Sequence, residues 1–192
     1  MKLQIVFRGS IALLALYSLH AKSAKETSQS TQVTGQIKGQ VFKPTLIEIR
    51  QLGRASVRNA SKTEYAEAFH LEFRNGKGFF ADNSILIMLQ LPSGSKLSNL
   101  KWTQKEVKFA SPEYDKQFFP SGNTLAHGAI GCRYSYKKAG KDMPHTEMSN
   151  TLGMSIIFGT QVKDRIAGAI YMTADGGKAV LKGTFTAVVK KV

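Results

Sequence analysis

The chain has 192 residues, of which 42% are hydrophobic and 21% are charged. These proportions are typical of a globular protein and exclude a disordered or fibrous chain, and the length suits one domain. The formal net charge is +14, which favours an anionic partner such as an acidic polysaccharide, a lipid headgroup or an envelope protein. No nucleic-acid motif accompanies this charge, so no nucleic acid partner is expected.

Residues 1–23 have the pattern of a cleaved secretory signal peptide. Lys2 and Arg8 supply positive charge, an apolar run extends from Ile11 to Leu19, and small residues follow it. The run is about half of the roughly 20 residues that a transmembrane helix needs, so no transmembrane span is expected after cleavage. We therefore expect an exported protein, periplasmic or extracellular.

After the signal peptide, the polar residues 24–32 indicate a disordered lead-in, and residues 33–192 are expected to form a single domain. The domain has one cysteine, Cys132, which excludes an internal disulfide. We interpret Cys132 as a small buried residue, because it shares an apolar strand face with Tyr134 and Tyr136.

From Val33 onward, apolar and polar residues alternate with a period of two, which predicts β-strands. The predicted strands are 33–42, 45–51, 67–74, 84–91, 98–103, 105–109, 129–137, 152–160, 165–173 and 179–190. No stretch has helical periodicity over more than two turns. The expected fold is therefore all-β: an antiparallel β-sandwich, or an open barrel, of about 8–10 strands.

The alternation also predicts which side chains face the interior. Phe69, Leu71 and Phe73 share one face of their strand, whereas the residues between them are polar. Residues 85–89 are apolar on both faces, which indicates a central or covered strand. A weak repeat places Gly39, Gly168 and Gly183 each between two apolar residues on a core-facing position, where we expect close packing under a bulky ring such as Trp102 or a phenylalanine, or a bend in the sheet.

The last two predicted strands are expected to form a C-terminal β-hairpin around Asp175-Gly176. Asp-Gly favours a two-residue type I′ turn, which would pair Ala174 with Gly177 and Met172 with Ala179. A phosphate-binding loop would require a helix after the glycines, and a strand is predicted there instead.

Two long predicted loops, 110–128 and 138–151, are where binding is expected. Aromatic rings in the first loop either cover the core or form an exposed platform for sugars or apolar partners. Lysines in the second loop add positive charge. The candidate ligand-binding residues are Tyr114, Phe118, Phe119, Lys138 and Lys141.

The sequence offers one alternative site, for a metal-dependent enzyme, from His127, His145 and Glu147. No HExxH or paired CxxC motif supports it, so we predict no metal site, no catalytic residue and no cofactor. The leading hypothesis is an exported, non-catalytic β-sandwich that binds an anionic or carbohydrate component of the envelope or the extracellular space. A structural or assembly subunit is a further alternative, and it would need a long unpaired edge strand.

Overall fold

The computed structural model describes residues 32–58, 63–75, 83–118, 128–141 and 143–192. The expected signal peptide and nearly all of the lead-in lie outside these ranges. Within them, the chain is all-β, as predicted, with a single short helix, α2 (Pro112–Phe118). The strands are β1 (Thr34–Ile37), β2 (Gln40–Phe42), β3 (Leu46–Arg58), β4 (Thr63–Arg74), β5 (Ser84–Pro92), β6 (Lys101–Lys108), β7 (Gly128–Tyr136), β8 (His145–Met148), β9 (Thr151–Val162), β10 (Arg165–Ala174) and β11 (Ala179–Lys191).

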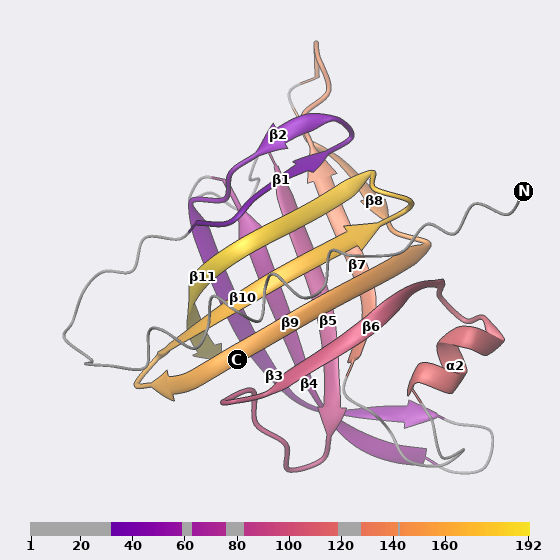
Figure 1. Cartoon of the computed structure of the whole chain (residues 1–192), viewed down its shortest axis with the longest axis vertical. Helices are drawn as coiled ribbons and strands as arrows, with labels where there is room; N and C mark the ends of the chain where they lie inside the picture. Colours follow the sequence, from indigo (N-terminus) through magenta and orange to yellow (C-terminus); the bar gives the residue numbers. More distant parts are fainter. Residues whose placement is uncertain (1–31, 59–62, 76–82, 119–127, 142) are drawn as a thin grey trace, which may run out of the picture.

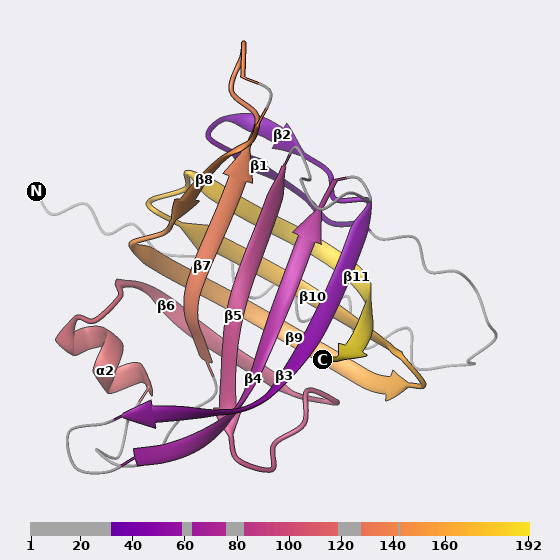
Figure 2. The ribbon, with the colours of Figure 1, turned by 180° about the vertical axis from the view of Figure 1, so that it is seen from behind.

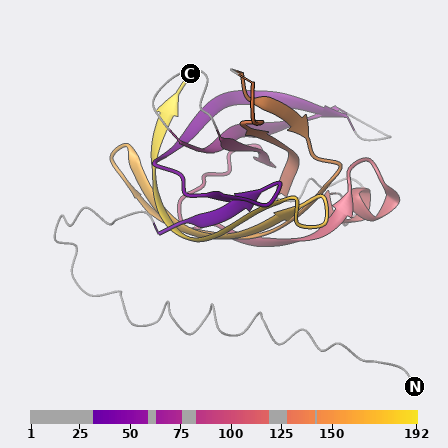
Figure 3. The same ribbon diagram turned by 90° about the horizontal axis from the view of Figure 1, so that it is seen from above.

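All eleven strands belong to one sheet, in the order β6-β9-β10-β11-β3-β4-β5-β7-β8, and the β1–β2 hairpin is attached through β1 to β11. The sheet folds back on itself: β6, β9, β10 and β11 form one layer, and β3, β4, β5 and β7 cross behind them at a steep angle (Figures 1 and 2). Seen from above, the two layers face each other across the interior (Figure 3). The layers are continuous where β11 pairs with β3, and this pairing is parallel.

The interior is filled by the side chains that the alternation assigned to it. Phe69, Leu71 and Phe73 are at most 4% exposed, and they meet apolar side chains of the opposite layer such as Phe185. Burial of each such side chain stabilises the fold by about 1.5–3 kcal/mol. β5 is central, between β4 and β7, as the apolar run at 85–89 predicted. Cys132 is buried, and burial raises the pKa of its thiol to about 12.

One glutamine side chain connects the two layers where β6 and β7 come together. Gln104 Nε2 donates to the Ala129 carbonyl oxygen at 3.1 Å, and the Ala129 amide donates to Gln104 Oε1 at 2.9 Å. Gln104 is 6% exposed and Ala129 is fully buried. The side-chain amide therefore replaces a backbone bridge between the strands, and we call this pair of bonds the amide bridge.

Several predicted boundaries were wrong. The predicted strands 45–51 and 67–74 correspond to parts of the longer strands β3 and β4. The segment 33–42 is not one strand, because Lys38 and Gly39 have φ angles of 51° and 79° and reverse the chain between β1 and β2. The segments 98–103 and 105–109 are replaced by one strand, β6, whose pairing with β9 is interrupted by a bulge between Gln104 and Val107. The predicted loop 138–151 contains β8, which pairs with β7.

The predicted loop 110–128 also contains secondary structure, because residues Pro112–Phe118 form α2. Ser111 caps this helix: its Oγ accepts a hydrogen bond from the Tyr114 amide at 3.2 Å. Proline in the first turn and acidic residues near the helix start are standard helix-start signals. The sequence Ser111-Pro112-Glu113 therefore indicates the start of a helix, although the helix is too short to show a periodic apolar stripe.

The C-terminal hairpin forms between β10 and β11, but the predicted register was wrong. Ala174 pairs with Ala179 and Met172 with Leu181, so the loop has four residues and not two. Asp175 and Gly176 do turn with positive φ, and the Gly177 amide donates to the Ala174 carbonyl at 3.1 Å. Gly177 itself has a φ of 92°, which is incompatible with a strand, so pairing begins two residues later.

Candidate functional site

The candidate aromatic residues in the described part of the chain lie around α2. Phe118 is 3% exposed, stacks on Tyr114 at a ring-centroid distance of 4.6 Å, and packs in a second small apolar cluster with Ala66. Gly128 lies directly under the Phe118 ring, where a Cβ atom would come within 2.5 Å of Phe118 Cζ. Phe118 thus covers the core and offers no exposed platform, and Phe119 lies outside the described residues.

Lys138 and Lys141 lie beyond the C-terminal end of β7, the strand whose first residue, Gly128, contacts Phe118. β7 has 9 residues, so its first and last Cα atoms are eight steps of about 3.3 Å apart, or about 26 Å. Phe118 contacts its first residue, Gly128, whereas Lys138 follows its last, Tyr136. The structure therefore separates the aromatic and the basic members of the candidate site instead of bringing them together (Figure 2).

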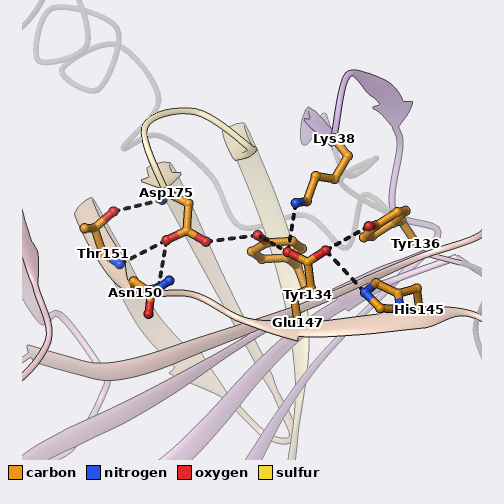
Figure 4. Close-up of polar contacts among 8 residues, drawn as sticks. All are labelled: Lys38, Tyr134, Tyr136, His145, Glu147, Asn150, Thr151 and Asp175. Carbon is orange, nitrogen blue, oxygen red and sulfur yellow. Dashed lines mark hydrogen bonds and ion pairs between the residues drawn. The ribbon is translucent and has the colours of Figure 1, made fainter.

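The end of the molecule near Lys138 contains a polar network centred on the Glu147 carboxylate (Figure 4). Lys38 Nζ lies 2.8 Å from Glu147 Oε2, and the Tyr136 hydroxyl donates to Glu147 Oε1 at 2.8 Å. His145 Nε2 lies 3.4 Å from the same Oε1 atom. The Lys38 ammonium is also 5.9 Å from the ring centroids of both Tyr134 and Tyr136, within the range of a cation–π contact. These contacts of Lys38 link the β1–β2 turn to β7 and β8.

A second carboxylate, Asp175, extends this network to the β10–β11 turn. Its Oδ1 accepts hydrogen bonds from the backbone amides of Asn150 at 2.7 Å and Thr151 at 3.2 Å. The Tyr134 hydroxyl lies 2.9 Å from Asp175 Oδ2 and 3.0 Å from Glu147 Oε2. A phenol has a single proton, so Tyr134 donates to one carboxylate at a time. Asp175 therefore joins β7, β9 and the last hairpin, in addition to forming the turn that the sequence predicted.

The electrostatics of this network stabilise its ionised form. The Lys38 ammonium, followed by the Tyr136 and Tyr134 hydroxyls, lowers the pKa of Glu147 to about 2. The hydrogen bond to Glu147 in turn raises the pKa of Lys38 above its ordinary value. Burial raises the pKa of Tyr134, as do its hydrogen bonds to the two carboxylates. Glu147 is therefore ionised and Lys38 protonated at neutral pH, which suits a structural ion pair.

The alternative metal site depends on His145 and Glu147, which are neighbours here, and on His127, which lies outside the described residues. Both Glu147 oxygens already accept bonds from Lys38 and the tyrosines. Among the residues that the structure describes, no three His, Cys, Asp or Glu side chains gather as metal ligands would.

Around this network, three turns bring a set of lysines to one end of the molecule. We call this set the lysine cluster: Lys38, Lys137, Lys138, Lys141 and Lys178. The Lys38 amide donates to the Lys178 carbonyl at 2.6 Å, and Gln40 Nε2 donates to the Lys137 carbonyl at 3.2 Å. Lys138 Nζ is 5.8 Å from the Tyr136 ring centroid, on which Lys38 also packs. The lysine cluster is thus assembled from the β1–β2 turn, the β7–β8 loop and the β10–β11 turn.

Sequence reasoning selected Lys138 and Lys141 but missed Lys38, Lys178, Tyr134 and Asp175 as members of this region. Lys38 and Glu147 are far apart in the sequence, so their contact has no local signal. The predicted faces did place Tyr134 and Tyr136 on the same side of β7, and that alternation is the one cue that the sequence offers.

No family model matches the chain, and no curated protein or solved structure matches it at a significant level. Among the described residues, no helix is long and apolar enough to cross a membrane.

Proposed function

We propose that this is an exported, non-catalytic binding protein that holds an anionic component of the envelope or the extracellular space at its lysine cluster. The observation that carries the proposal is the convergence of five lysines from three separate turns at one end of the molecule.

The charge of this end supports an anionic ligand. Three carboxylates of the described residues lie at the lysine cluster, and all three serve internal roles: Glu147 with Lys38 and the tyrosines, Asp175 with backbone amides and Tyr134, and Glu106 with the Gly176 amide and the Thr151 hydroxyl. The sequence adds Asp142 to the β7–β8 loop, and the balance remains positive. Lys137, Lys138, Lys141 and Lys178 are exposed. Clustered surface charges of one sign raise the local concentration of counter-ions and accelerate their association.

Charge, and not aromatic stacking, is the basis of this recognition. The Phe118 ring is buried and about 26 Å from the lysine cluster along β7. Binding should therefore weaken steeply with added salt, because exposed charges are screened beyond about 8 Å at physiological ionic strength.

Affinity for heparin, used as a generic soluble polyanion, tests the proposal. One variant replaces Lys137, Lys138, Lys141 and Lys178 by glutamine. A matched control replaces four exposed lysines away from the cluster by glutamine: Lys101 and Lys105 of β6, Lys116 of α2 and Lys163 of the β9–β10 turn. Both variants lose the same net charge, so only the position of the charge differs. We expect the first variant to bind at least about tenfold more weakly than the control, and equal losses in the two variants would refute the proposal.

A further inference from the structure

Two large apolar side chains are exposed beside the lysine cluster. Val41 on β2 is 73% exposed, and Met143 in the β7–β8 loop is 55% exposed. Their neighbours are lysines: Lys141 precedes Met143 by two residues, and Gln40, next to Val41, bonds to Lys137. The β1–β2 hairpin and the β7–β8 loop both lie at the upper end of the molecule in Figure 1, and the loop forms its tip.

Resting on the function proposed above, we propose that the anionic partner is a lipid bilayer surface, on which the lysine cluster contacts acidic headgroups while Val41 and Met143 enter the interface. A soluble polyanion would use the lysines and would leave both apolar side chains in water. A bilayer with acidic headgroups matches both features, because it presents negative charge over an apolar layer. Charge complementarity therefore selects an anionic surface, and the apolar side chains select a lipid one.

The β2 strand does not favour a protein partner that adds a strand to its free edge. β2 has 3 residues and pairs with β1 alone among the described strands, which is too short an edge to align another chain. The side chain of Val41 points away from the core, opposite to the buried Phe42. β2 can therefore contact a partner through the outward side chain of Val41 and not through backbone pairing.

Binding to vesicles of phosphatidylcholine mixed with phosphatidylglycerol, compared with pure phosphatidylcholine, tests this inference by co-sedimentation. We expect binding only to the mixed vesicles, and a loss of about fivefold for each replacement by glutamine of an exposed lysine of the cluster, namely Lys137, Lys138, Lys141 or Lys178. The double variant Val41→Thr, Met143→Gln should bind these vesicles about tenfold more weakly, while its affinity for heparin stays unchanged. Val162→Thr is the matched control, because Val162 is 65% exposed at the far end of β9 and its replacement should change nothing.

A labelled variant reports the insertion directly. Cys132 is fully buried, so an environment-sensitive fluorophore attached to a Met143→Cys variant reports from the loop alone. Its emission should shift to the blue with mixed vesicles and not with heparin. Vesicle binding without a blue shift, or with no effect of the double variant, would overturn the bilayer inference and leave anion binding standing. Failure to bind either vesicles or heparin would refute both.

Discussion

Replacement of Gln104 by leucine should destabilise the protein far more than the replacement of any exposed glutamine. Gln104 is the residue whose side chain makes the amide bridge to Ala129, and both partners are buried. Leucine has nearly the same volume but can neither donate nor accept. The Gln104→Leu variant would therefore leave the Ala129 amide and carbonyl without partners in the interior, at the place where β6 and β7 meet.

The magnitude follows from the two groups left unsatisfied. Each buried backbone group without a partner costs about 1–3 kcal/mol, so the loss from two such groups should be about 2–6 kcal/mol before any gain from the added apolar surface. That is a large part of the roughly 5–15 kcal/mol that stabilises a typical domain. The loss should appear in urea unfolding as a lower midpoint with an unchanged slope.

Gln117 provides a matched control within the same chain. Its side-chain amide also pairs with a single backbone residue: the Lys105 amide donates to Gln117 Oε1 at 2.8 Å, and Gln117 Nε2 donates to the Lys105 carbonyl at 3.4 Å. These bonds are exposed, so water can replace them, and Gln117→Leu should change the free energy of unfolding by no more than about 0.5 kcal/mol. If the two variants lost equal stability, or if Gln104→Leu lost less than about 1 kcal/mol, the amide bridge would not stabilise the contact between β6 and β7.

Three further variants test other contacts by urea unfolding. Tyr134→Phe removes the hydroxyl between Glu147 and Asp175 and should cost about 1–2 kcal/mol, whereas Tyr171→Phe on the exposed face should cost nothing measurable. Because the pKa of folded Glu147 is lowered to about 2, its contribution is complete above about pH 4.5 and is lost as the pH falls toward 2; Glu147→Gln should therefore cost more stability at pH 7 than at pH 3, and a constant difference would contradict the ion pair with Lys38. Gly168→Ala would place a Cβ atom 2.5 Å from Phe185 Cζ and should cost about 1–3 kcal/mol, whereas Gly159→Ala meets only ordinary contacts at 3.6 Å and should stay within about 0.5 kcal/mol of wild type.

The strands and their faces could be predicted because a period of two is a local property of the sequence. The buried set Phe69, Leu71 and Phe73 and the central position of β5 both followed from it. The prediction that three glycines lie under bulky rings was confirmed at Gly168, under Phe185. It was wrong at Gly39, which reverses the chain with a positive φ, and at Gly183, where backbone and not a ring lies close. Each of the confirmed features depends on the burial of apolar side chains, and the pattern of apolar residues can be read from a few neighbouring positions in the sequence.

The candidate site was harder to predict because its parts meet only through the topology. Two loops that flank one strand come together only if one of them folds back along the sheet. Here the length of β7 separates Phe118 from Lys138. The Lys38 turn was missed because lysine seldom adopts a positive φ, so a lysine before a single glycine does not mark a turn strongly. The two-residue register around Asp175 failed because a third consecutive residue, Gly177, also has a positive φ.

Amide chemical shifts measured by NMR during a titration with heparin oligosaccharides test the central claim most directly, because they locate the anion without any substitution. We expect the shifts to change at the three turns that carry the lysine cluster, namely around Lys38, Lys138 and Lys178, and to reverse at high salt. The amides of β6 and α2, which carry as many exposed lysines, should stay unchanged. Shifts that spread evenly over both regions, or that centre on α2, would contradict an anion-binding site at the lysine cluster.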